Sequence, residues 1–380
     1  MWAVKADRVL AEWGWVENGV VWINDDRIEA IGAIGAAGVP TLEAVGCTAV
    51  PGFIDLHVHG GGGASVWSAE EEAVDGMLRA HCRGGTTALL PTIYPAEPEA
   101  MEAQIRAIPA KRPGGGATAF GAHLEGPHLN PARMGGLAPR ERLRPLESAE
   151  LQRLREASRV PLRLVTLAPE VRGALDLIRL CRRSGVSVAL GHTTADYETT
   201  LAAIEAGATA ATHVFNTFQF ARNARDPRAL EALLLDERVV PHLIADLAHV
   251  REPFIRLLLR LKGAERIALI TDALAEAGTP EAPPVKLAAD GRILGSTMLM
   301  IDAVRNLTRR MGLPLEDAVT MASRVPAAEM SLNKGRIAPG ADADVTLLDA
   351  DLRVRATIVE GTVAFCDGLD VPRGAPVERE

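Results

Sequence analysis

The sequence between Val50 and Asp272 alternates short apolar runs with longer amphipathic stretches, and this alternation restricts the possible folds more than any other feature. The apolar runs predict eight buried strands, at residues 50–57, 86–91, 118–124, 162–167, 186–191, 209–214, 240–246 and 267–272. Helical periodicity between them predicts helices at Glu70–Arg83, Glu147–Ser158, Arg172–Ser184, Tyr197–Ala206 and Pro253–Leu261. Repeated strand and helix units favour a TIM-like parallel (β/α)8 barrel of the α/β class. An open doubly wound sheet is the alternative, although no Gly-x-Gly-x-x-Gly motif opens a helix.

The two ends of the chain have a different pattern from the middle. Residues 1–49 contain short alternating strands, which predict a small antiparallel sheet, and residues 336–380 return to strands of the same kind. A sheet this small cannot bury itself alone, so we expect the two ends to combine into one discontinuous β-sandwich with a shared core. The predicted division is a β-sandwich of residues 1–49 and 336–380 and a barrel of residues 50–335.

Composition excludes several classes of protein. The net charge of −8 and the lack of a concentrated basic segment argue against nucleic-acid binding, and no apolar run approaches the length of a membrane span. The first residues lack a basic region followed by an apolar core, so we expect a cytoplasmic protein without a secretory signal. The four cysteines are scattered without paired spacing, which predicts packing residues and neither a disulfide framework nor a cysteine zinc site.

Histidine and carboxylate side chains recur where the predicted strands end. His57 and His59 are separated by one residue on the first strand, so both side chains project to the same side. The later strand ends carry His123, Glu125, His192, His213, His249 and Asp272. Six of the nine histidines therefore lie on one rim of the predicted barrel, where such folds place their active sites. A hydrogen-bonded core histidine explains any one of them, but not their recurrence at successive strand ends.

This set of side chains predicts a divalent transition metal as cofactor. Histidine together with carboxylate suits Zn(II) or Fe(II) better than Mg(II) or Ca(II), which prefer oxygen ligands. Co and Mn accept the same ligands, and the sequence is compatible with one ion or with two.

Six short motifs in this region resemble those of one known family. The segments are Pro51-Gly-Phe-Ile-Asp, His123-Leu-Glu-Gly-Pro, Leu190-Gly-His-Thr, Thr212-His-Val-Phe-Asn, Thr271-Asp-Ala and Gly295-Ser-Thr. In this order they are similar to the N-acetylglucosamine-6-phosphate deacetylases of the amidohydrolase superfamily. The resemblance extends from about residue 48 to the motif that starts at Gly335. It implies a metal-dependent amide hydrolase in which Glu125 replaces the carboxylated lysine that bridges two metals in many relatives.

The resemblance implies metal ligands among the rim residues. Glu125, His192 and His213 would hold the main ion, as the matching residues do in the family. His57 and His59 would hold a second ion, since some members keep this pair and others have lost it.

The resemblance also implies a reaction, the deacetylation of N-acetylglucosamine 6-phosphate to glucosamine 6-phosphate and acetate by a homodimer. Asp272 would take a proton from the attacking water and return it to the leaving amine, and an N-cap of a following helix is the alternative for this residue. Two other functions stay open. One is a related amidohydrolase that acts on another N-acyl amino sugar or N-acyl amino acid, and the other is a metal-binding scaffold without activity.

Four positions match those that hold the sugar phosphate in the family. They are Asn216, Thr217, Arg225 and His249. An arginine suits phosphate because its planar group makes two charge-assisted hydrogen bonds. The chain departs from the family here, since one more residue separates Asn216 from Arg225, and Arg222 is a rival for the same role.

Two further segments depart from the family pattern. Gly136 and Leu137 lie where the family has a polar contact to the substrate, and we expect His128 to replace part of that contact. The second segment matches a stretch that lines the sugar site and consists of Ile293, Leu294 and Gly295. Its two bulky aliphatic residues predict a less polar pocket.

Overall fold

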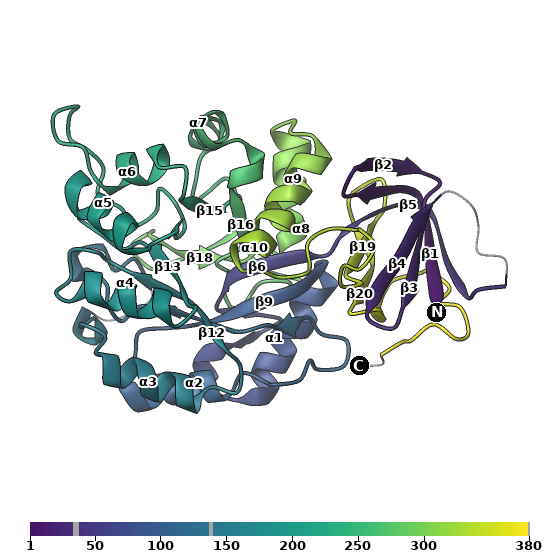
Figure 1. Ribbon diagram of the computed structural model, residues 1–380, viewed down its shortest axis with the longest axis horizontal. Helices are drawn as coiled ribbons and strands as arrows, with labels where there is room; N and C mark the ends of the chain where they lie inside the picture. The colour runs from purple at the N-terminus through teal and green to yellow at the C-terminus, as the bar shows by residue number, and fades with distance from the viewer. Residues whose placement is uncertain (33–37, 137–139, 379–380) are drawn as a thin grey trace.

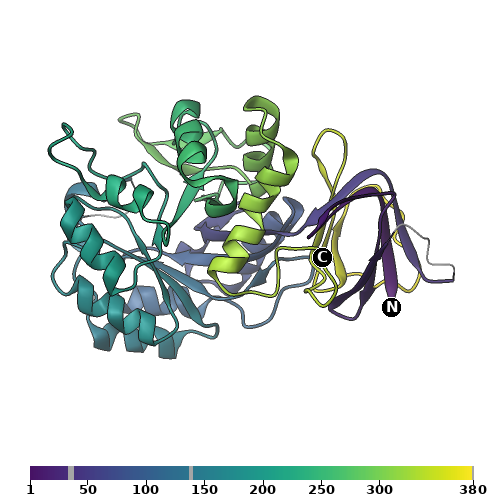
Figure 2. The same ribbon diagram turned by 45° about the horizontal axis from the view of Figure 1, so that its top comes forward.

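The computed structural model describes residues 1–32, 38–136 and 140–378. Figure 1 shows two parts side by side: a barrel of parallel strands surrounded by helices, and a smaller sheet, the terminal sheet, built from both ends of the chain. Figure 2 gives a second view, in which both termini lie at the terminal sheet. This arrangement confirms the predicted fold class.

The barrel is one sheet of parallel strands. In spatial order these are β6 (Phe53–Val58), β9 (Thr86–Ile93), β11 (Ala122–Glu125), β12 (Leu162–Leu167), β13 (Ser187–Leu190), β14 (Ala210–Ala211), β15 (Val240–Ile244) and β16 (Ala268–Ile270), with the short β10 (Thr118–Ala119) beside β9. The first and last strands approach each other, because Asp272 N donates to His57 O at 2.9 Å and His59 N donates to Ala273 O at 2.9 Å. The barrel is therefore nearly closed. Most of its strand residues are buried on both faces, which explains the continuous apolar runs in the sequence.

Helices connect the barrel strands and cover the outside of the barrel (Figure 1). They are α1 (Glu71–Arg83), α2 (Pro98–Arg106), α3 (Ser148–Ala157), α4 (Ala174–Arg183), α5 (Tyr197–Ala206), α6 (Ala229–Leu235), α7 (Glu252–Lys262), α8 (Met300–Arg305), α9 (Leu315–Ala322) and α10 (Arg324–Glu329). Shorter helical turns are η1 (Val66–Ser68), η2 (Pro131–Arg133), η3 (Arg140–Arg142), η4 (Ala264–Arg266) and the π-helical η5 (Asn306–Arg310). The five helices expected from periodicity are α1, α3, α4, α5 and α7. In α4, for example, Leu177, Ile178 and Cys181 are buried at helical spacing.

The terminal sheet combines strands from both ends of the chain. In spatial order they are β21 (Thr362–Cys366), β20 (Val354–Val359), β19 (Val345–Leu348), β5 (Thr41–Pro51), β1 (Trp2–Ala11), β3 (Val20–Asn24) and β4 (Arg27–Gly32), with β2 (Gly14–Glu17) beside β1. The two ends meet where β19 pairs antiparallel with β5, and they share an apolar core that includes Trp2, Ile28, Val345 and Ile358. The expectation of purely antiparallel pairing in residues 1–49 is wrong, because β1 and β5 are parallel. Alternation of polar and apolar residues reports burial and carries no information about strand direction.

Two hairpins lie outside both sheets. β7 (Gly60–Gly61) pairs with β8 (Ala64–Ser65), and β17 (Val285–Leu287) pairs with β18 (Ile293–Ser296). The second hairpin follows the last barrel strand, and its residues Ile293 and Leu294 line the cavity described below.

The third predicted strand is broken into β10 and β11. Gly121 lies at the break, where an added Cβ atom would collide with the side chain of Arg163. The sixth predicted strand is reduced to β14. Both differences concern strand length, and the spatial order of the strands remains that of a barrel.

The cysteines and the length of the apolar segments were both considered from composition. The four cysteines are free thiols, and Cys47, Cys82 and Cys181 are buried. In the described ranges, no helix combines the length and the apolar character needed to cross a lipid bilayer.

Candidate active site

Six ionisable side chains meet at the carboxyl end of the barrel, each within or directly after a parallel strand. His57 belongs to β6 and His59 follows it, while Glu125 is the last residue of β11. The others follow β13, β14 and β16 and are His192, His213 and Asp272. All six are buried. The strand-end pattern in the sequence thus corresponds to one site in space.

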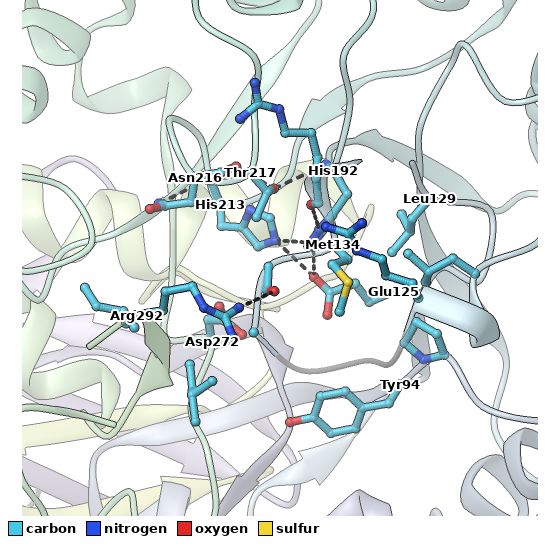
Figure 3. A pocket seen from close by; sticks show the side chains of 18 of the residues that line it. Tyr94, Glu125, Leu129, Met134, His192, His213, Asn216, Thr217, Asp272 and Arg292 are labelled. Atoms are coloured by element: carbon cyan, nitrogen blue, oxygen red, sulfur yellow. Dashed lines mark hydrogen bonds and ion pairs between the residues drawn. The ribbon is translucent and has the colours of Figure 1, made fainter. Parts of the chain in front are cut away.

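Glu125 is shared between two pairs of histidines, and Figure 3 shows it beside one of them, His192 and His213. Its Oε1 lies 2.9 Å from Nε2 of His192 and 3.0 Å from Nε2 of His213. Its Oε2 lies 3.1 Å from Nε2 of His59 and 3.5 Å from Nε2 of His57. Within each group of two histidines and Glu125, the ligand atoms lie within 4.8 Å of one another. The site therefore contains two buried groups suited to metal ions, joined by one carboxylate.

Backbone carbonyls determine the tautomers of two of these histidines. Nδ1 of His59 lies 3.1 Å from the carbonyl oxygen of Thr92, and Nδ1 of His192 lies 2.8 Å from that of Arg133. A carbonyl only accepts, so Nδ1 carries the hydrogen in both rings. In the neutral imidazole the lone pair is then on Nε2, which faces Glu125.

The donor set fits a bound cation. Nε2 of His57 lies 3.1 Å from Nε2 of His59, and Nε2 of His192 lies 3.0 Å from Nε2 of His213. When Nδ1 carries the hydrogen in each ring, as it does in His59 and His192, both nitrogens of a pair present lone pairs, and a cation between them would be coordinated by both. Imidazole nitrogen with one carboxylate oxygen is the ligand set of Zn(II) and related ions.

The electrostatics of the site keep both carboxylates ionised. Burial by itself raises the pKa of Glu125, but His57, His192 and His213 outweigh it and hold the pKa well below its usual range. Burial likewise raises the pKa of Asp272, and the neighbouring His57 and His59 bring it below its ordinary value.

The pKa of His59 is shifted in the opposite direction, upward, because its neighbours are the two carboxylates. Burial alone lowers its pKa, but Asp272 and Glu125 raise it to about 9. The negative potential that draws a proton to this imidazole also favours a bound cation.

Asp272 is positioned as a base. Its buried Oδ1 lies 3.4 Å from Nε2 of His57 and of His59, and it accepts no hydrogen bond from the described residues. The alternative, an N-cap, does not apply, because the next helix in the described chain is α8, which begins at Met300. An ionised carboxylate oxygen with a free lone pair can accept a proton from a ligand in the cavity.

Three site residues adopt an unusual backbone conformation. The φ angle is 49° at His192, 27° at His213 and 51° at Asp272. L-residues rarely adopt positive φ, and such strain is concentrated at functional sites. The strain here turns each side chain out of its strand direction into the barrel mouth.

A cavity of about 910 Å³ opens at four of the six side chains, and its lining includes Glu125, His192, His213 and Asp272 (Figure 3). This volume is in the range of small-molecule sites. Several positions expected to contact substrate line the cavity, namely Asn216, Thr217, His249, Gly136, Ile293 and Leu294. Leu137 lies outside the described residues.

The structure places four other expected contacts away from the described cavity lining. Arg222 and Arg225 lie in an exposed loop after Thr217. His128 accepts from Leu146 N at 3.0 Å through Nδ1, and its Nε2 lies 3.4 Å from Val171 O, so both ring nitrogens face backbone groups. The remaining residue is Gly295, where an added Cβ would lie 2.7 Å from Cγ of Leu274. Their roles in binding stay predictions.

The cavity has lining residues that sequence reasoning missed. Tyr94 follows the last residue of β9, and its ring stacks on His59 with centroids 3.9 Å apart. The strand-end rule that identified the histidines also applies to this residue. Three arginines of the lining were not singled out either: Arg133 in η2, Arg140 in η3, and Arg292 in the turn between β17 and β18. Arg292 also donates to Gly135 O at 3.2 Å, which connects the β17–β18 hairpin to the loop after β11.

Known proteins resemble the chain over nearly its whole length. The sequence profile of the Amidohydrolase family matches residues 48–366. An N-acetylgalactosamine-6-phosphate deacetylase from Escherichia coli is 35% identical and covers 95% of this chain and 98% of its own length. An N-acetylglucosamine-6-phosphate deacetylase from Vibrio furnissii is 32% identical, with 97% and 96% covered. A mutant of the N-acetyl-D-glucosamine-6-phosphate deacetylase from Mycobacterium smegmatis, solved in complex with N-acetyl-D-glucosamine-6-phosphate, is 33% identical with a TM-score of 0.87, covering 96% and 99%. These findings confirm the resemblance read from the motifs.

Proposed function

The chain belongs to the amidohydrolase family, and from this premise we propose that it deacetylates an N-acetylhexosamine 6-phosphate, with N-acetylglucosamine 6-phosphate as the substrate. One observation carries the proposal: Glu125 lies between two histidine pairs, and the free Oδ1 of Asp272 faces the same cavity. That arrangement brings a cation site and a base to one point, as hydrolysis of an amide requires.

Two sets of residues would hold metal. Glu125, His192 and His213 form the main set, and His57 with His59 forms the second around the same carboxylate. We propose Zn(II) or Fe(II) in the main set, with Co or Mn as substitutes. A divalent ion bound there supplies Lewis acidity, which lowers the pKa of water to about 7 and polarises an amide carbonyl.

Asp272 carries the proton transfers in this proposal. Its Oδ1 accepts a proton from the water that attacks the acetyl carbon. The same oxygen then donates this proton to the sugar nitrogen as the carbon–nitrogen bond breaks, which leaves acetate and a free amine. Nε2 of His57 and Nε2 of His59 each lie 3.4 Å from this oxygen, so the base lies beside the second metal set.

The sugar phosphate would be held on the other side of the cavity. We assign Asn216, Thr217 and His249 to this contact, because all three line the cavity. Arg225 is the predicted phosphate ligand by resemblance. Arg225→Ala tests this assignment: a large rise in KM with the phosphorylated substrate alone supports the role, and unchanged KM removes it.

N-acetylgalactosamine 6-phosphate is the second candidate substrate. The relatives at 35% identity, from Escherichia coli and a Shewanella strain, are N-acetylgalactosamine-6-phosphate deacetylases. The two sugars differ only in the configuration at C4. The ratio of kcat/KM for the two phosphorylated sugars decides between them.

The deciding experiment is acetate release by the purified, metal-loaded protein. We expect release from at least one N-acetylhexosamine 6-phosphate, and its loss after chelation with recovery when Zn(II) is restored. Activity only on another N-acyl amino sugar or N-acyl amino acid would replace the proposed substrate. Metal binding without hydrolysis of any of these amides would support the scaffold alternative. The homodimer and the cytoplasmic location stay predictions.

A further inference from the structure

A buried aspartate that no assignment above uses lies behind the cavity. Asp246 comes two residues after β15 ends at Ile244, and its side chain is only 3% exposed. Its Oδ1 accepts from Ala248 N at 2.9 Å and from His249 N at 2.8 Å. Its Oδ2 lies 2.6 Å from Nδ1 of His249. Within the described residues, the hydrogen bonds of this carboxylate therefore all stabilise one four-residue turn.

The turn is strained in a way that those contacts support. Leu247 has a φ angle of 65°, in the left-handed region that a bulky residue rarely adopts. The two backbone hydrogen bonds to Asp246 stabilise this conformation. From outside the turn, Asn306 of η5 donates to Ala245 O at 3.0 Å, which fixes the strand end that precedes it. Strain of this kind is typical of segments that position a functional group.

The group that the turn positions is the imidazole of His249. It lines the cavity, and because Nδ1 is taken by Asp246, Nε2 is the nitrogen left for a ligand. Two charged groups act on this ring: Asp246 in its own turn and Asp272 after β16. Burial alone lowers the pKa of His249, and these two carboxylates, Asp246 foremost, raise it above its ordinary value.

We propose that Asp246 is a positioning residue that holds His249 as a cationic donor, with Nε2–H directed at the phosphate of the substrate. The inference rests on the proposed function for the identity of the ligand, but the Asp246–His249 pair itself is independent of it. A carboxylate on Nδ1 fixes the ring orientation and the tautomer. A charged donor binds phosphate more strongly than a neutral one.

Asp246→Asn is the main test, because asparagine keeps an oxygen for the two backbone donors, while its NH2 group replaces the charged Oδ2 that accepts Nδ1–H of His249. We expect KM for the N-acetylhexosamine 6-phosphate to rise roughly tenfold, the size expected when a charge-assisted hydrogen bond becomes neutral. We expect kcat, and kcat/KM for the sugar without phosphate, to change by less than about threefold. Equal losses on both sugars would indicate a merely structural role and overturn the proposal.

A double-variant comparison separates action through His249 from direct effects. In the His249→Gln background, Asp246→Asn should have no further effect on KM, and additive effects would contradict the inference. Asp349→Asn is the matched control. Asp349 also accepts two backbone hydrogens, from Asp351 at 2.9 Å and Arg353 at 2.8 Å, but it lies between β19 and β20 of the terminal sheet. We expect native kinetics from this control.

A titration keeps the inference testable even if the variant does not fold or no acetate is released. In the Zn(II)-loaded native protein, the nitrogen NMR signal of the His249 ring, assigned by its loss in His249→Gln, should report an imidazolium at pH 7. A neutral ring at pH 7 overturns the proposal whatever the substrate. An imidazolium in a protein that releases no acetate would leave the pair intact and reject the proposed function.

Discussion

Two buried groups of ionisable side chains in this molecule balance their charges differently. The first, the histidine cluster, opens onto the cavity and consists of His57, His59, Glu125, His192 and His213. The second, the lysine cluster, lies where the terminal sheet meets the barrel and consists of Lys334, Asp342, Asp344 and Glu360. Each contains a buried carboxylate, Glu125 in the first and Asp344 in the second, for which an unpaired charge is costly.

The lysine cluster contains its own cation. Nζ of Lys334 lies 2.9 Å from Asp344, 3.2 Å from Asp342 and 3.2 Å from Glu360. Burial alone lowers the pKa of Lys334, but Asp344 and Glu360 raise it above its ordinary value. This cluster is complete without any ligand, so its function is to join the two parts of the chain.

The histidine cluster is not complete in the same sense. Within the part of the chain that the structure describes, the ion pairs of Glu125 are with imidazoles only. Its lone pairs converge, and it faces a cavity instead of packed side chains. This difference distinguishes a structural ionic cluster from a functional one. The structural cluster contains a lysine that balances its carboxylates, and the functional cluster contains no lysine or arginine partner for Glu125 among the described residues.

Removing the shared carboxylate should have the largest effect. Glu125→Gln keeps the shape but loses the charge that joins both histidine pairs, so we expect metal content to fall and kcat/KM to drop at least about 10⁴-fold. Metal analysis and acetate-release kinetics measure both quantities. Glu360→Gln, the matched change in the lysine cluster, should leave both unchanged. Glu125→Gln protein with full metal and activity within tenfold of native would refute the distinction between the clusters.

Asp272→Asn should have the next largest effect, and it should lower kcat without changing the metal content. We expect kcat to fall roughly 10³-fold, because general acid–base catalysis by one side chain contributes about 10²–10⁴. Metal content should stay native, since the two metal groups do not include Asp272. The control is Asp196→Asn at a true helix N-cap, where Oδ1 accepts from Thr199 N at 2.8 Å. If both aspartates gave similar small losses, Asp272 would be no base.

Lys334→Met should cost stability and leave the chemistry intact. Removing one partner of a buried ion pair destabilises proteins by about 3–5 kcal/mol, and here the fully buried Asp344 would be left without its counter-charge. Urea unfolding measures this loss, and kinetics below the transition should give a native kcat. Lys286→Met, at an exposed pair with Glu276, should cost less than about 1 kcal/mol. Equal losses of unfolding free energy in the two lysine variants would show that burial of the Lys334 ion pairs does not increase their contribution to stability.

The sequence was informative about the fold wherever burial produces periodicity. Parallel barrel strands are apolar on both faces, and the amphipathic helices between them have a regular stripe, so both were predicted. The pairing of β1 with β5 and the break at Gly121 depend on partners distant in sequence. The local sequence pattern does not contain information about those contacts. The predicted strand direction in residues 1–49 and the predicted length of the third barrel strand were therefore wrong.

The candidate site also contains some residues that the sequence pattern predicted and others that it missed. Histidine that recurs at successive strand ends is unusual enough to attract attention, and closure of the barrel brings these residues together with Glu125 and Asp272. Tyr94 and Asp246 occupy comparable positions but were overlooked, because tyrosine and aspartate near a strand end are common in packed structures. The arginines of the described cavity lining come from the short turns η2 and η3 and from the β17–β18 hairpin, and the arrangement of these segments depends on tertiary contacts such as that of Arg292 with Gly135.

The smallest effect is expected for His81. Unlike the histidines of the histidine cluster, this buried histidine has no carboxylate partner among the described residues. Nε2 of His81 in α1 donates to Gly60 O at 2.9 Å, and burial lowers its pKa from 6.5 to about 4. The unfolded chain therefore binds a proton below pH 6.5 that the folded protein refuses until about pH 4, so stability falls as the pH drops through this window. From pH 7 to pH 5 the loss due to His81 should be about 2 kcal/mol. His81→Gln keeps a donor for Gly60 and should show a pH dependence of the unfolding free energy that is shallower by this amount. Parallel curves for the two proteins would mean that His81 takes up its proton in the folded state as readily as in the unfolded chain.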